Sequence, residues 1–199
     1  MTVYTLSGVA RWEEEVKRSR FLAIAAAVRQ PEEALAFFEA HRVPEATHNC
    51  WAFQIGDTYR FNDDGEPGGT AGRPILQAIQ GQQCDQVAVL VIRWFGGVKL
   101  GTGGLVRAYG GCAAQCLRQA QKQPIIETVD IVCHCPFADL DRIKARLMDQ
   151  AAQIVGEEFD ASGVTWQLKV AREGHEAFMD RFIDQTSGQG RINLLQSGD

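Results

Sequence analysis

Apolar and polar positions in the first half of the chain predict strands interrupted by helices. Apolar stretches at 3–6 and 21–28 flank a charged, partly alternating stretch, and this pattern predicts antiparallel strands. Pro31 followed by two glutamates is typical of a helix start, because acidic side chains favour the first turn, and we expect the helix to reach about Arg42. The run 87–92 is apolar at every position, so it predicts a central strand that is covered on both faces.

Further elements follow on both sides of that run. Residues 50–55 predict another strand, and the glycine-rich segment 63–73 is expected to lead into a short helix that opens at Pro74. Beyond the loop 96–104, apolar residues recur at helical spacing and predict an amphipathic helix. These residues are Leu105, Ala108, Tyr109, Cys112, Ala113, Cys116, Leu117 and Ala120.

The second half of the chain predicts a separate domain. Gln123 and Pro124 are expected to end the long helix, and the composition then turns acidic, so we place a boundary between residues 1–124 and 125–199. The later elements are a strand at 125–135, a helix marked by Leu140, Ile143, Leu147 and Ala151, strands at 154–159 and 164–170, a helix carrying Phe178 and Phe182, and a strand at 192–195. The order βαββαβ is the ferredoxin-like plan, so the fold class is α+β with two domains.

Composition excludes several classes of protein. The 199 residues are 45% hydrophobic and 23% charged, which excludes a disordered or fibrous chain. No apolar run approaches the ~20 residues of a membrane span, and the charged residues 11–15 interrupt any secretory pattern, so we expect a cytoplasmic protein. The six cysteines lack the pattern of a disulfide framework or of a zinc site, so we expect reduced thiols, no metal and no cofactor.

Charge is distributed unevenly along the chain. The net charge is −5, but residues 1–124 carry 13 Lys and Arg against 12 Asp and Glu, whereas residues 125–199 carry 7 against 13. Residues 86–126 contain five cations and no acid, and these cations are Arg93, Lys99, Arg107, Arg118 and Lys122. Either this segment is an ordinary solvated helix face or it is a surface for phosphate groups.

The loop before the long helix carries a candidate anion site. Lys99 and Arg107 flank the sequence Gly101, Thr102, Gly103 and Gly104, where backbone N–H groups, a hydroxyl and two cations can converge on one phosphate. Arg107 and Arg118 lie within about 20° of each other on a helix, with Lys122 one turn further. The alternative is that the glycines only permit tight packing of strand against helix. Neither a Walker nor a Rossmann pattern is present.

A second glycine-rich loop, residues 61–74, carries an acidic cluster. Asp63, Asp64 and Glu66 are suited to Mg²⁺ binding or to acid–base chemistry, and Thr70 and Arg73 complete this second candidate set. The same residues are also typical of a turn in which an acid pairs with Arg60 or Arg73. We favour the structural interpretation, because turn formation accounts for every residue without a ligand.

These loops resemble the Impact family, in its bacterial YigZ-like branch. The resemblance is carried by Arg20-Phe21, Asp63-Asp64-Gly65-Glu66-Pro67, Gly69-Thr70-Ala71-Gly72-Arg73-Pro74, Arg93-Trp94-Phe95-Gly96-Gly97 and Leu100-Gly101-Thr102-Gly103-Gly104-Leu105-Val106-Arg107-Ala108-Tyr109. It implies a first domain with the left-handed βαβ fold of a superfamily that includes a ribosomal protein and elongation-factor domains. It also implies a ferredoxin-like second domain similar to the last domain of the translocation elongation factor. Trp94 is the visible departure, since relatives often have tyrosine or phenylalanine there.

The resemblance also bears on function. Eukaryotic members regulate translation initiation by competing for the activator of an amino-acid-starvation kinase. For the bacterial branch the resemblance implies a role in nucleic-acid binding or in the translation machinery, with no catalytic residues assigned.

Three functions are compatible with the sequence. We favour a non-catalytic cytoplasmic protein that places the basic face of residues 93–122 on RNA or the ribosome and influences translation. The alternative is an enzyme that holds a phosphorylated small molecule at the glycine-rich loops, with an acid of the 63–66 cluster as base or metal ligand. A third is an adaptor that binds a protein partner through the exposed sheet face of the second domain. Oligomeric state is not predicted.

Overall fold

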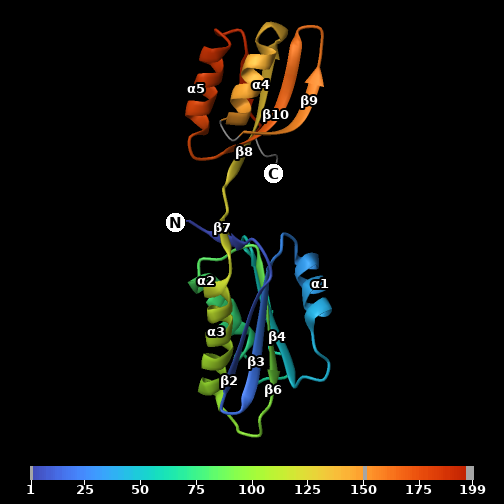
Figure 1. Ribbon diagram of the computed structural model, residues 1–199, viewed down its shortest axis with the longest axis vertical. Coiled ribbons are helices and arrows are strands. Elements are labelled where there is room, and N and C mark those ends of the chain that lie inside the picture. Colours follow the sequence, from blue (N-terminus) through green and yellow to red (C-terminus); the bar gives the residue numbers. More distant parts are fainter. Residues whose placement is uncertain (1, 150–151, 196–199) are drawn as a thin grey trace. The chain divides into compact units, whose positions relative to one another are not determined.

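Two domains make up the chain in the computed structural model, which describes residues 2–149 and 152–195 (Figure 1). The compact units are residues 1–125 and 126–199, each with its own main sheet and its own buried apolar residues. The α+β class is therefore confirmed. None of the described helices is long and apolar enough to cross a membrane.

The first domain is built on a five-stranded antiparallel sheet in the order β2-β3-β6-β4-β5. Its strands are β1 (Tyr4–Leu6), β2 (Ala10–Val16), β3 (Ser19–Ala27), β4 (His48–Ile55), β5 (Thr58–Asn62), β6 (Val87–Trp94) and β7 (Lys122–Pro124), with β1 and β7 forming a separate pair. Its helices are α1 (Pro31–His41), α2 (Gly72–Gly81) and α3 (Thr102–Gln119). The strands and helices expected before residue 120 are confirmed, and β5 is an addition.

Strand β6 is central and separates two apolar cores. Val89 and Val91 pack with α2 and α3 on one face, while Leu90 and Ile92 pack with α1 on the other (Figure 1). Burial on both faces explains why the run is apolar at every position. Strands β3 and β4 are both antiparallel to β6, so they run parallel to each other on either side of it, and α1 makes the crossover between them.

Two boundaries differ from expectation. Helix α3 ends at Gln119 because Ala120 is extended, with ψ of 143°, so Lys122 belongs to β7 and not to the helix. Lys122 is therefore not one helical turn beyond Arg118. Helix α2 begins at Gly72, two residues before Pro74.

The second domain is a four-stranded antiparallel sheet in the order β11-β8-β10-β9. Its elements are β8 (Thr128–Pro136), η1 (Phe137–Asp139), α4 (Leu140–Asp149), β9 (Gln153–Phe159), β10 (Gly163–Ala171), α5 (His175–Gln185) and β11 (Arg191–Leu194). Ile143 of α4 and Phe178 of α5 pack with Trp166 in one core. The expected ferredoxin-like order is confirmed, and Ala151 lies outside the described residues.

Candidate nucleic-acid interface

Asp63 holds the start of α2. One carboxylate oxygen accepts the N–H groups of Ala71 and Gly72, at 3.0 and 2.8 Å, and the other accepts the N–H of Gly69 at 2.8 Å. The partial positive charge and free N–H groups of this helix start are therefore matched by an internal anion. The Asp63 carboxylate therefore occupies the N–H groups that a ligand would need at the start of α2.

The neighbouring acid and threonine also hold the loop together. The Asp64 carboxylate accepts the Asn49 N–H at 2.5 Å, and the Asp64 carbonyl accepts the His48 Nδ1–H at 2.7 Å. The buried Thr70 hydroxyl donates to the Pro67 carbonyl at 2.6 Å. These contacts fit the interpretation of residues 63–73 as a structured turn, while Arg73 is exposed.

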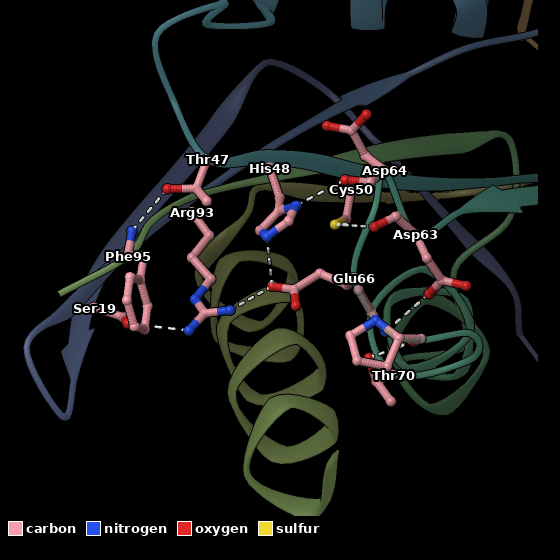
Figure 2. Close-up of polar contacts among 12 residues, drawn as sticks. Ser19, Thr47, His48, Cys50, Asp63, Asp64, Glu66, Thr70, Arg93 and Phe95 are labelled. Carbon is pink, nitrogen blue, oxygen red and sulfur yellow. Dashed lines mark hydrogen bonds and ion pairs between the residues drawn. The ribbon is translucent and has the colours of Figure 1, made fainter. Parts of the chain in front are cut away.

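Glu66 is the centre of a buried polar network (Figure 2). One of its carboxylate oxygens accepts hydrogen bonds from Arg93 Nη1 at 2.5 Å and from the Tyr109 hydroxyl at 2.7 Å, and His48 Nε2 lies 3.7 Å from it. Burial raises the pKa of Tyr109 far above its ordinary value and so keeps the phenol a proton donor. The several donors offset the cost of burying the carboxylate.

Arg93 is not a surface cation, contrary to expectation. It is only 4% exposed, because it follows Val91 on the face of β6 that packs under α3, and it pairs with Glu66. Among the described residues neither Arg60 nor Arg73 forms the expected ion pair, and Glu66 pairs with Arg93 instead. Arg93 Nη2 also donates to Ser19 Oγ at 3.3 Å, which connects β6 to the β2–β3 hairpin.

The loop that leaves β6 is fixed against this network. The Phe95 N–H donates to Thr47 Oγ1 at 2.9 Å, and the Gly96 N–H donates to Ser19 Oγ at 3.3 Å. A Cβ on Gly96 would lie 1.9 Å from the Arg18 carbonyl oxygen, so the loop and the hairpin turn are in direct contact. Phe95 itself is 47% exposed.

The start of α3 differs from that of α2 because no side chain in the described part of the chain takes the place that Asp63 has at α2. Gly101 adopts a φ of 74° at the cap position, where glycine is favoured, and its carbonyl accepts the Leu105 N–H. Thr102 and Gly103 are exposed, and Gly104 is half-buried against Leu100. No described side chain is bonded to the first N–H groups of this helix, as an anion site requires.

Four exposed cations lie on the β2–β3 hairpin turn, on the loop that contacts this turn and on the start of α3. They are Lys17 and Arg18 at the hairpin turn, Lys99 in the loop and Arg107 in the second turn of α3, and we call them the basic end. In the described part of the chain none of the four forms an ion pair. The Arg107 guanidinium lies over the first turn of α3, where a Cβ on Gly103 would be 3.6 Å from its Nη1.

Sequence reasoning missed the hairpin half of the basic end. Lys17 and Arg18 follow three consecutive glutamates, so local charge conceals them, and their approach to Gly96 depends on the pairing of β3 with β6. The available signal was a two-residue turn between paired strands, which places both side chains at the tip of the hairpin.

The remaining predicted cations lie elsewhere. Arg118 is exposed and donates to Gln115 Oε1 at 2.9 Å, about 16 Å along α3 from Arg107 at 1.5 Å per residue. Lys122 is half-buried, and its Nζ lies 3.2 Å from Gln82 Oε1. The structure therefore groups Lys99 and Arg107 with the glycine loop and separates Arg118 and Lys122 from them.

The cysteines of the chain are buried thiols. The six cysteines are unpaired and buried, and burial raises the pKa of Cys116 to about 12 and that of Cys135 to about 11. Among the described residues, no group of three or more His, Cys, Asp or Glu side chains is placed to hold a metal ion.

One constellation in the second domain has the residue types of a hydrolase triad but not its geometry. The Ser162 hydroxyl donates to Asp160 at 2.6 Å, and His134 Nε2 lies 3.0 Å from the same hydroxyl. A nucleophilic serine donates its proton to histidine, with the acid on the opposite ring nitrogen. Here Asp160 accepts hydrogen bonds from Ser162, and these bonds lower the pKa of its carboxyl. An aspartate that accepts bonds from the residues just after it is typical of a turn.

The fold and this site define a two-domain α+β protein whose first domain presents an uncapped helix start among exposed cations. The family model of the Impact N-terminal domain matches residues 17–117, and that of a domain of unknown function, DUF1949, matches residues 133–189. The chain belongs to the Impact family, as the loop motifs indicated.

Relatives match most of the chain. It is 51% identical over 160 residues to an IMPACT family member of Thermus thermophilus, covering 80% of this chain and 88% of that protein. It is 39% identical over 155 residues to the IMPACT family member YigZ of Escherichia coli, covering 74% and 76%. The crystal structure of a hypothetical protein superposes with a TM-score of 0.73 at 31% identity, over 99% of this chain and 98% of that one.

Proposed function

We propose that the chain is a cytoplasmic RNA-binding protein that acts on translation and uses the basic end of its first domain. The observation that carries this proposal is the set of four exposed cations on the hairpin turn, the loop that contacts it and the start of α3, none of which is ion-paired within residues 2–149 and 152–195. Such cations and free N–H groups bind phosphate groups, and this electrostatic attraction supplies a large part of the affinity for nucleic acids. Six reduced thiols suit a cytoplasmic setting.

The geometry favours binding over catalysis. An enzyme acting on a phosphorylated small molecule would need a carboxylate free to serve as base or metal ligand. Asp63 and Asp64 hold backbone N–H groups, and Glu66 is shared by Arg93 and Tyr109. These acids build the scaffold that supports the basic end.

The test is the salt dependence of RNA binding, measured by fluorescence anisotropy with a labelled RNA oligonucleotide. For the wild type we expect the logarithm of the association constant to fall linearly with the logarithm of salt concentration. The double variant Lys99→Ala/Arg107→Ala removes two phosphate contacts, so its slope should be smaller by roughly 1.4 to 2.

Arg118→Ala is the matched control, because Arg118 is an exposed arginine of the same helix at its other end. Its affinity and salt slope should equal those of the wild type. Affinity that does not depend on salt, or an equal loss in the control, would overturn the proposal.

A further inference from the structure

We propose that the RNA bound at the basic end is single-stranded and that one of its bases stacks on Phe95. This inference rests on the proposed function and adds the class of ligand. It starts from an aromatic side chain that is exposed next to the cations instead of being buried in either core.

The Phe95 ring is exposed and yet held in place. Its backbone N–H is bonded to Thr47, and the Arg93 guanidinium carbon lies 5.5 Å from the ring centroid. Arg93 is bonded to both Glu66 and Ser19, so the ring lies beside a guanidinium that two other side chains hold (Figure 2). A pre-positioned ring loses little conformational entropy when a base stacks on it.

The adjacent aromatic residue is placed differently from Phe95. Trp94 points to the other face of the sheet, and the Arg20 guanidinium lies 3.9 Å from the centroid of its ring. One face of the tryptophan is therefore already occupied by a cation. Phe95 is 47% exposed and has its cationic neighbour on the buried side.

Phe95 also lies where a bound strand would pass. It directly precedes Gly96, which touches the Arg18 backbone, and Lys99 is four residues further along the same loop. Cations that track phosphates beside an aromatic ring form the arrangement with which proteins bind single strands. In a duplex the faces of the bases are covered by their neighbours in the stack, and the ring has nothing to contact.

The experiment compares a single-stranded RNA with a hairpin of the same length and composition, by anisotropy, for the wild type and Phe95 variants. We expect the single strand to bind more tightly. Phe95→Ala and Phe95→Leu should each weaken single-strand binding by about 5- to 150-fold, the equivalent of about 1–3 kcal/mol for one stacked base, with an unchanged salt slope. Phe95→Tyr should bind as the wild type.

Tyr59→Ala is the matched control. Tyr59 is 55% exposed on β5 opposite Gln54, at the end of β4 away from His48 and Arg93, so its removal should not change affinity. Equal affinity of the wild type for hairpin and single strand, or wild-type affinity in Phe95→Leu, would overturn this inference. The proposed function would survive that result if Lys99→Ala/Arg107→Ala still reduced the salt slope and Arg118→Ala did not.

Discussion

Glu66 is the residue on which the scaffold of the basic end most depends. Its partners Arg93 and Tyr109 come from β6 and α3, and Arg93 in turn bonds the hairpin through Ser19. Replacement by an amide of the same shape leaves the Arg93 cation buried without a counter-charge. We therefore predict that Glu66→Gln lowers the free energy of unfolding of the first domain by about 3–5 kcal/mol, measured by urea denaturation.

An exposed ion pair of the same domain, Glu13 with Arg20, provides the control for this prediction. Glu13 lies 3.4 Å from Arg20, and both side chains are about half exposed, at 55% and 52%. Because solvent screens such a pair, Glu13→Gln should cost less than about 1 kcal/mol. If Glu66→Gln lowered the free energy of unfolding as little as Glu13→Gln does, the buried pair of Glu66 and Arg93 would not stabilise the first domain as proposed.

At the level of secondary-structure elements, the basic end depends on the contact between the loop that follows β6 and the β2–β3 hairpin. Gly96 lies against the backbone of Arg18, and the position it would need for a Cβ is already filled. We predict that Gly96→Ala destabilises the first domain by about 1–3 kcal/mol, the usual cost of overpacking, and weakens RNA binding because Lys99 moves away from the hairpin. Thermal unfolding and anisotropy measure the two effects.

Gly111→Ala tests whether the effect belongs to the contact and not to glycine as such. Gly111 lies within α3, and a Cβ there would meet nothing within 4 Å outside the helix. Alanine is the better helix former, so this variant should gain about 0.5–1 kcal/mol and bind RNA as the wild type does. A loss of stability in both variants would contradict the role assigned to Gly96.

Periodicity predicted most elements because each depends on local sequence. The all-apolar run of β6 and the helical spacing in α3 are set by residues within a few positions of one another. The partner of Glu66 was missed, because Arg93 is 27 residues away and meets it only when the loop 63–73 folds over the sheet. Strand alternation could have predicted that Arg93 is buried, since Arg93 lies on the same face of β6 as the buried Val91.

At the scale of the whole molecule, the buried thiols are divided between two apolar cores, one in each domain. Cys50, Cys84, Cys112 and Cys116 lie in the first core, whereas Cys133 and Cys135 lie in the second. Burial raises the pKa of Cys135 to about 11, so at pH 8 only about one thiol in a thousand is ionised while the domain is folded. Unfolding returns the thiol to a pKa of about 8.5 and makes it reactive.

Labelling with a maleimide can therefore show whether the domains unfold separately. The second domain is the smaller of the two. Small domains bury a smaller fraction of their surface than large ones, so we expect the second domain to unfold at lower urea. Brief labelling at increasing urea, read by mass spectrometry, should add two labels in a first step and four in a second. In Cys133→Ala/Cys135→Ala the first step should disappear and the second should remain. A single step that adds all six labels would mean that the two cores unfold as one unit.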